Sequence, residues 1–217
     1  MNEKYQNKYR IESHRMPNWD YSGNGIYFLT IVTQNRVCNL GKIVKTHGRA
    51  SLELSDYGKI VETEFLKSFE IRNELLLDEF IIMPNHLHAI IVLDRPEIDL
   101  DGTNGSHGLQ VETHCRASLQ QRDRQRDQQS PNSFIRKPKS ISSFMAGFKS
   151  SVNSKIDDYI DDHKLDVPKY YRNNYFFQSN YHDHIIRNNA EFERIKNYII
   201  NNPENWEDDK FNQKRKS

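Results

Sequence analysis

Two histidines separated by one residue carry the clearest chemical signal in this sequence. His86 and His88 lie in the stretch MPNHLHAII, and their apolar neighbours are typical of a buried strand. Side chains two positions apart on a strand point to the same face, so the two imidazoles could close on one metal ion. The alternative is a pair of histidines on a solvated face. The apolar surroundings favour the metal-binding interpretation, because a purely structural strand has little use for two polar rings.

A second group of reactive side chains lies in the segment SNYHDHIIRN, residues 179–188. We expect a short helix to begin at Tyr181, and His184 then lies three positions further along on the same helical face. A phenol beside a metal ion can act as a nucleophile, because the metal polarises the target phosphate and helps to activate the hydroxyl. Tyr181 is therefore the candidate nucleophile.

Other tyrosines compete for this role, since the chain has 11 of them. An ordinary half-buried position is the alternative for each one, Tyr181 included. Tyr198 falls on an expected helix with Ile195 and Ile199, and packing explains it better. The tyrosines of the run 170–178 lie in a strand-like segment, where alternate rings would be buried.

A set of cations surrounds the second expected helix and could bind nucleic acid. Single-stranded nucleic acid needs positive charge for its backbone and aromatic rings for base stacking. For each cation taken singly, a solvated helix face is an equally good interpretation. The candidate DNA-binding residues are Arg136, Lys137, Lys139, Lys149 and Lys155.

The elements that must position these residues follow a recognisable order. Apolar patterning and capping residues predict strand, helix, strand, strand, helix, strand and then C-terminal helices. This is the split-βαβ, ferredoxin-like order of an α+β protein: an antiparallel sheet with two helices on one face and the other face available. The expected bounds are 26–33, 55–69, 75–83, 86–93, 140–156 and 170–178, followed by a short helix from residue 181 and a last helix over about 190–201.

Between about Asp94 and Lys139 the sequence changes character. Gly, Asn, Ser, Gln and alternating Arg and Asp dominate, and no periodicity survives. Such a segment is typical of an insertion loop or a flexible linker. We therefore expect one domain over residues 1–217 that carries a polar, flexible insertion at about 94–139.

Composition excludes several classes of protein. The chain is 11% aromatic, which argues against a disordered chain, and no apolar run approaches the roughly 20 residues of a membrane-spanning helix. The net charge of +1 disfavours a DNA-coating protein but allows a local basic patch. The N-terminus lacks a signal-peptide pattern, and Cys38 and Cys115 are too few for a disulfide framework, so we expect an intracellular protein.

Several motifs, taken together and in order, resemble one known family. They are similar to those of the REP-associated tyrosine transposases, relatives of the single-tyrosine insertion-sequence transposases in the HUH endonuclease superfamily. The set spans nearly the whole chain outside the insertion. The motifs are WDYSGNGIYFLT, TQNR, FIIMPNHLHAIIV, FMAGFKS, NYHDHIIRN and YIINNPENW.

The resemblance implies a mechanism. His86 and His88 match the paired histidines that ligate Mg²⁺ or Mn²⁺, and Tyr181 matches the nucleophile, with His184 as the candidate third metal ligand. The tyrosine would attack a phosphodiester of single-stranded DNA, form a 5′-phosphotyrosine link and release a 3′-hydroxyl. Departures at His182 and in the insertion bear on substrate recognition and leave the metal pair and the tyrosine in place.

The resemblance also implies the partner. Members of the family recognise DNA hairpins of palindromic repeats, so we expect a transposase that nicks and joins such DNA in the cytoplasm of a prokaryotic cell, near the nucleoid, without a membrane. A monomer is favoured over a homodimer. One alternative is a domesticated protein that binds DNA hairpins without cutting them. Another is a single-stranded RNA binder on the same topology, although such modules carry aromatic rings where this chain carries His86 and His88.

Overall fold

A four-stranded antiparallel sheet organises the molecule, with strand order β6-β7-β3-β8. The computed structural model describes residues 4–5, 8–9, 19–46, 49–95, 138–171 and 174–212. The sheet strands are β3 (Gly25–Val32), β6 (Leu75–Met83), β7 (His86–Leu93) and β8 (His182–Ile186). Two short pairs lie outside this sheet: β1 (Lys4–Tyr5) with β2 (Lys8–Tyr9), and β4 (Gly41–Thr46) with β5 (Arg49–Leu54).

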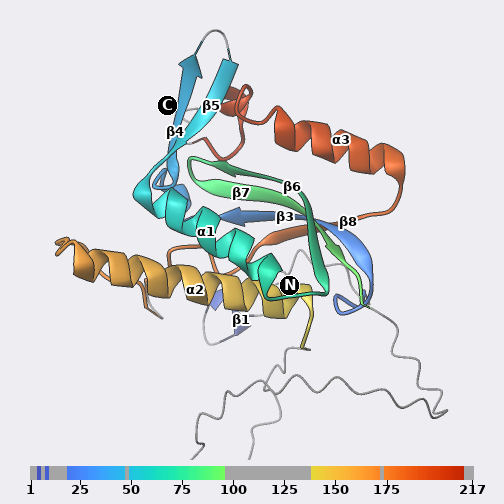
Figure 1. Cartoon of the computed structure of the whole chain (residues 1–217), viewed down its shortest axis with the longest axis horizontal. Coiled ribbons are helices and arrows are strands. Elements are labelled where there is room, and N and C mark those ends of the chain that lie inside the picture. The colour runs from blue at the N-terminus through green and yellow to red at the C-terminus, as the bar shows by residue number, and fades with distance from the viewer. Residues whose placement is uncertain are drawn as a thin grey trace, which may run out of the picture.

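Helices cover both faces of the sheet. Helix α1 (Asp56–Glu70) and helix α2 (Ile141–Asp162) lie on one face, and α3 (Asn189–Ile200) lies on the other (Figure 1). The second face is therefore partly covered, and the expectation that it is available is wrong in this respect. Short 3₁₀ turns, η1 (Gln34–Arg36) and η2 (Trp206–Asp208), follow β3 and α3. The order of β3, α1, β6, β7, α2 and β8 confirms the predicted α+β, ferredoxin-like arrangement. In the described residues no helix combines the length and apolar character needed to cross a membrane.

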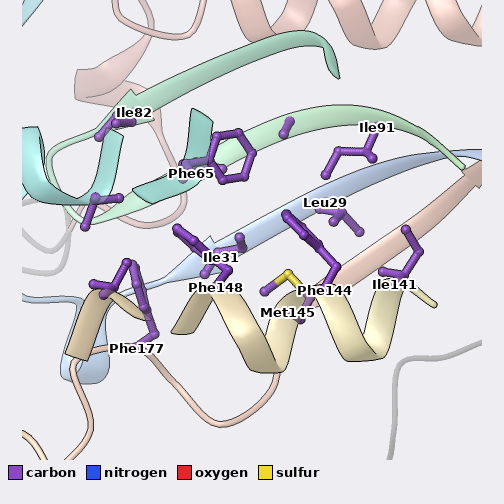
Figure 2. Close-up of a cluster of buried hydrophobic side chains, with 14 of the residues drawn as sticks. Leu29, Ile31, Phe65, Ile82, Ile91, Ile141, Phe144, Met145, Phe148 and Phe177 are labelled. Carbon is purple, nitrogen blue, oxygen red and sulfur yellow. The ribbon is translucent and has the colours of Figure 1, made fainter. Parts of the chain in front are cut away.

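The main core lies between the sheet and the helix pair α1/α2. Odd-numbered residues of β3, such as Leu29 and Ile31, point into it because successive strand residues face opposite ways. Figure 2 shows Phe144 and Phe148 of α2 reaching up to these strand residues, with Phe65 of α1 beside them. All five side chains are almost fully buried. Each is expected to contribute about 1.5–3 kcal/mol to folding by leaving water.

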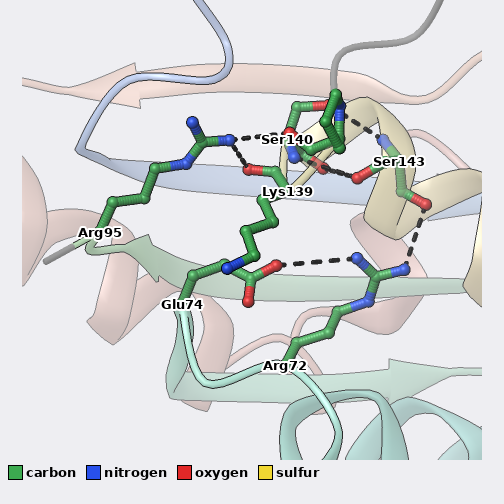
Figure 3. Close-up of polar contacts among 7 residues, drawn as sticks. Arg72, Glu74, Arg95, Lys139, Ser140 and Ser143 are labelled. Atoms are coloured by element: carbon green, nitrogen blue, oxygen red, sulfur yellow. Dashed lines mark hydrogen bonds and ion pairs between the residues drawn. The ribbon is translucent and has the colours of Figure 1, made fainter. Parts of the chain in front are cut away.

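Polar contacts fix the beginning of α2, where the chain returns from the segment 96–137. Ser140 and Ser143 form a reciprocal capping box, which satisfies backbone N–H groups that the first helical turn leaves unpaired. The guanidinium of Arg95 donates to the carbonyl oxygens of Pro138 (2.8 Å) and Lys139 (Figure 3). The described residues on either side of 96–137 therefore meet at one place. The predicted insertion lies mostly outside the described residues.

The fourth sheet strand is not where the sequence pattern puts it. The pattern predicts a strand over 170–178 and a helix from Tyr181, and both predictions are wrong: β8 begins at His182 and pairs with β3, His184 lying opposite Phe28. Phe176 and Phe177 enter the core as buried anchors instead, and Phe177 makes one isolated bridge to Thr33. The aromatic run resembles a strand because buried anchors and strands use the same residue types.

Candidate active site

His86 and His88 lie on the face of the sheet that α3 covers. In β7 the odd-numbered residues enter the main core, and Ile90 packs against Ile195 and Ile199 of α3 instead. His86 and His88 share the face of Ile90 by strand alternation. Their exposed fractions are 0% and 1%, and their ring centroids are 4.6 Å apart. The predicted juxtaposition of the two imidazoles is thus present in the structure.

Each ring is oriented through its Nδ1 atom. His86 Nδ1 lies 2.9 Å from Asn85 Oδ1, and His88 Nδ1 lies 2.8 Å from Thr30 Oγ1. Among the described residues, His86 Nε2 has no hydrogen-bond partner. A buried ring nitrogen without a partner is unfavourable in a purely structural role, and it is what a metal ligand requires.

Burial keeps both histidines neutral. Desolvation lowers the pKa of His86 to about 3, and the nearby charge of Lys210 acts in the same direction. Desolvation also places the pKa of His88 well below its usual value, with further contributions from His86 and Lys210. Neutral imidazole is the form that binds metal ions, so the site favours ligation over protonation at neutral pH.

A tyrosine from α3 reaches the histidine pair. The hydroxyl of Tyr198 lies 3.2 Å from His88 Nε2, and the two ring centroids are 5.2 Å apart. Burial, and next the charge of Asp209, raise the pKa of Tyr198, while a side-chain hydrogen bond from Asn202 opposes that rise. The phenol is therefore protonated in this arrangement and is held at hydrogen-bond distance from the imidazole.

A carboxylate lies beside the two imidazoles. Asp209, His86 and His88 each offer one ligand atom, and these atoms all lie within 4.8 Å of one another. Asn202 is 2% exposed, and its Oδ1 has no hydrogen-bond partner among the described residues. Two neutral imidazoles with a carboxylate suit a divalent ion such as Mn²⁺ or Mg²⁺. The residues present fit the metal that the motifs imply.

The site opens into a hollow of about 660 Å³ whose lining includes His88, Tyr198, Asp209 and two cations, Arg194 and Lys210. The lining also includes Asp208, so the two cations are balanced by two carboxylates, and a bound divalent ion would add the positive charge. With an ion bound, Arg194 and Lys210 could help to hold an anionic group, such as a backbone phosphate, next to the tyrosine.

The structure does not bring Tyr181 to the histidines. Tyr181 packs against the main core on the α1/α2 side of the sheet, and the Nζ atom of Lys149 lies 5.7 Å from its ring centroid. His184 does line the hollow, but its Nε2 lies 2.7 Å from Glu191 Oε1. The group of potential metal ligands contains Asp209 in the place predicted for His184.

The candidate DNA-binding cations are not gathered into one patch among the described residues. Lys149 is largely buried and donates to the carbonyl oxygens of residues 178, 179 and 180. Burial lowers its pKa to about 8. Lys155 pairs with Asp158 at 3.0 Å, and Lys139 is exposed before α2. Arg136 and Lys137 lie outside the described residues.

Sequence reasoning set Tyr198 aside as a packing residue and did not single out Asn202, Asp209, Arg194 and Lys210. One signal was available, since Tyr198 in the last turn of α3 and Asn202, two residues beyond the end of that helix at Ile200, are close in the sequence. Asp209 offers no such signal, since it lies in an irregular segment after η2 that reaches the site through the tertiary fold.

Fold and site together define an α+β protein of ferredoxin-like topology with a buried histidine pair beside a pocket that a tyrosine and an aspartate line. No family model matches the chain. An uncharacterized protein of Haemophilus influenzae is 30% identical over 202 residues, which cover 92% of this chain and 91% of that one. The chain belongs to the same family as this Haemophilus protein. A solved structure of a REP-associated tyrosine transposase bound to a REP hairpin is also similar, with 17% identity, a TM-score of 0.46 and coverage of 87% of this chain and 73% of that chain.

Proposed function

We propose that this chain is a metal-dependent transposase that cuts and rejoins single-stranded DNA through a covalent tyrosine intermediate, with Tyr198 as the nucleophile. One observation carries the proposal: the Tyr198 hydroxyl lies 3.2 Å from Nε2 of a buried, neutral histidine. The sequence motifs favour the same class of enzyme but favour Tyr181 for this role. The geometry supports Tyr198 instead, because Tyr181 packs on the other face of the sheet.

His86, His88 and Asp209 would hold the metal ion, Mg²⁺ or Mn²⁺, with Asn202 as a further oxygen donor. When bound, a divalent ion polarises a phosphate oxygen and stabilises the charge that develops in the transition state. Asp209 replaces His184 as the third ligand in this proposal, since its carboxylate belongs to the same group of donor atoms.

Tyr198 supplies the covalent chemistry. Its oxygen attacks the phosphorus of a phosphodiester, the bond from phosphorus to the 3′-oxygen breaks, and the 5′-phosphate stays on the tyrosine. The side chain is 41% exposed, so the phenol proton passes to water, and the leaving 3′-oxygen takes a proton from the same source. The hydrogen bond from Asn202 favours the phenolate. The link preserves the energy of the broken bond, so a 3′-hydroxyl can reverse the step.

The proposed substrate is single-stranded DNA beside a hairpin of palindromic repeats. The motif resemblance favours this substrate, and Arg194 and Lys210 line the hollow, where they can contact backbone phosphates. His86, His88, Asp209 and Tyr198 all come from one chain. One molecule thus supplies a complete set of catalytic groups, which supports action as a monomer.

A covalent-trapping experiment tests the nucleophile. A pool of single-stranded hairpin oligonucleotides, labelled at the 3′ end, is incubated with protein and Mn²⁺ and separated on a denaturing gel. We expect a labelled protein band from the wild type and from Tyr181→Phe, the matched control, but none from Tyr198→Phe. Peptide mapping should place the adduct on Tyr198.

Two outcomes would contradict the proposal. An adduct that maps to Tyr181, or that persists in Tyr198→Phe, would show that Tyr198 is not the nucleophile. Hairpin binding by the wild type without any adduct or nicking supports a non-cutting DNA-hairpin-binding protein.

A further inference from the structure

Asn85 is a buried polar residue in the two-residue turn between β6 and β7. Turn residues usually lie at the surface, yet Asn85 is 0% exposed. Met83 and His86 pair directly on either side of it. A buried amide must satisfy its donors and its acceptor, so its partners show what holds it there.

The partners of Asn85 fix which side of the amide is which. Asn85 Nδ2 donates to the carbonyl oxygen of Arg36 (3.0 Å) and to that of Phe211 (2.8 Å). A carbonyl oxygen can only accept, so the NH₂ group must face these two atoms. The amide oxygen then faces His86, with Oδ1 2.9 Å from Nδ1.

This orientation determines where the proton of His86 lies. An amide oxygen has no proton to give, so His86 Nδ1 must donate, and Nε2 keeps its lone pair. That Nε2 atom is buried without a hydrogen-bond partner among the described residues, and it belongs to the group of His86, His88 and Asp209. Two distant segments, at residues 36 and 211, thereby determine which ring nitrogen of His86 carries the proton.

We propose that Asn85 is a positioning residue that holds His86 in the Nδ1–H tautomer and directs the Nε2 lone pair toward the metal site. The inference rests on the proposed function for the identity of the ligand, but the tautomer itself can be measured without metal, DNA or activity. Outer groups that orient a ligating histidine typically alter metal affinity by about 10- to 100-fold when they are removed.

The experiment uses the full-length, metal-free protein. Long-range ¹H–¹⁵N correlation spectra distinguish a protonated from an unprotonated ring nitrogen, and His86→Gln assigns the signal. We expect His86 to show protonated Nδ1 and unprotonated Nε2 in the wild type. In Asn85→Ala we expect mixed tautomers and a loss of Mn²⁺ affinity of about 10- to 100-fold.

Thr33→Val is the matched control, because the Thr33 hydroxyl lies within hydrogen-bond distance of Asn85 O (3.0 Å) and of Val37 O (2.8 Å), and it shares its proton between these two carbonyl oxygens. This variant should lower Tm yet keep the wild-type tautomer and Mn²⁺ affinity. A protonated Nε2 in the wild type overturns the proposal even when Asn85→Ala does not fold. So does an Asn85→Ala variant with an unchanged tautomer. A protein with the expected tautomer that fails to nick DNA refutes the proposed function alone.

Discussion

The two faces of the central sheet use the same strands for opposite purposes. On the α1/α2 side, Leu29, Ile31 and their neighbours meet a layer of phenylalanines, so burial needs no polar partner. On the α3 side, Thr30 and His88 are buried as well, but each of their polar atoms needs a partner or a ligand. Alternation along one strand thus separates the residues that stabilise the fold from those that can perform chemistry.

Removing an imidazole from the α3 face should have the largest effect. His88→Ala deletes a proposed metal ligand and the partner of the Tyr198 hydroxyl, so we expect the nicking rate to fall at least about a thousandfold, the equivalent of several kcal/mol of transition-state stabilisation. Excess EDTA should act on the wild type in the same way. Nicking that continues in His88→Ala at the wild-type rate would show that the α3 face does not carry the catalytic site.

Truncating a side chain of the α1/α2 face should affect stability instead. Phe148 is 2% exposed and packs against Phe65 and Phe144, so Phe148→Ala should lower the free energy of unfolding by about 3–5 kcal/mol. Urea denaturation measures this loss. At temperatures where the variant is folded, its nicking rate should stay within a few-fold of wild type, and a thousandfold loss would show that the two faces are not separate.

Acid should expose the difference between the faces in the metal-free protein. The pKa of His86 in the folded state is about 3, against about 6.5 in an unfolded chain, so the unfolded chain binds more protons as the pH falls. Above about pH 6.5 His86 therefore does not lower the stability of the folded protein. Below that pH its burial in the neutral form lowers the free energy of unfolding by about 1.4 kcal/mol per pH unit. Between pH 7 and pH 5, His86→Ala should lose about 2 kcal/mol less than the wild type in urea denaturation. Equal losses would contradict a buried, neutral His86.

The smallest effect concerns the contact between the phenol and the imidazole. The Tyr198 hydroxyl lies at hydrogen-bond distance from Nε2 of His88, and a metal ion would bind the lone pair of the same atom. Tyr198→Phe removes a hydrogen bond worth about 1 kcal/mol, so its Mn²⁺ affinity should rise about fivefold, as measured by calorimetric titration. Tyr181→Phe should bind Mn²⁺ like the wild type, and a weaker affinity in Tyr198→Phe would indicate that the phenol assists the metal.

The sequence predicted the strand pair and its histidines well because their signals are local. Residues 75–93 alternate between two environments, and the i, i+2 spacing of His86 and His88 fixes their common face wherever the strand lies. Tyr198 shows why the proposed nucleophile was harder to find. Its neighbours Ile195 and Ile199 do pack against the sheet, so the packing interpretation was correct for them, but Tyr198 lies at the edge of that contact and reaches His88.

Tyr181 was misplaced for a different reason. Its predicted proximity to His184 depended on a helix, and the segment forms the edge strand β8 after a stretch anchored by Phe176 and Phe177. Whether a short segment becomes a helix or an edge strand depends on the partner strand that tertiary structure supplies. Asp209 had no local pattern at all, since the fold alone brings it to residues more than a hundred positions earlier in the chain.

The contact of Arg95 with Pro138 and Lys139 brings the end of β7 and the start of α2 together at one junction, which could accept an inserted segment. Because Arg95 and residues 138–139 are in contact, a flexible connection of any length could join them at little cost: each doubling of a flexible loop costs only about 0.6 kcal/mol. This junction lies where β7 ends and α2 begins, while the histidine pair lies at the other end of β7. Evolution or an engineer can therefore exchange the intervening segment, for example for a sequence-specific DNA-binding module, and retarget the protein without redesigning its chemistry.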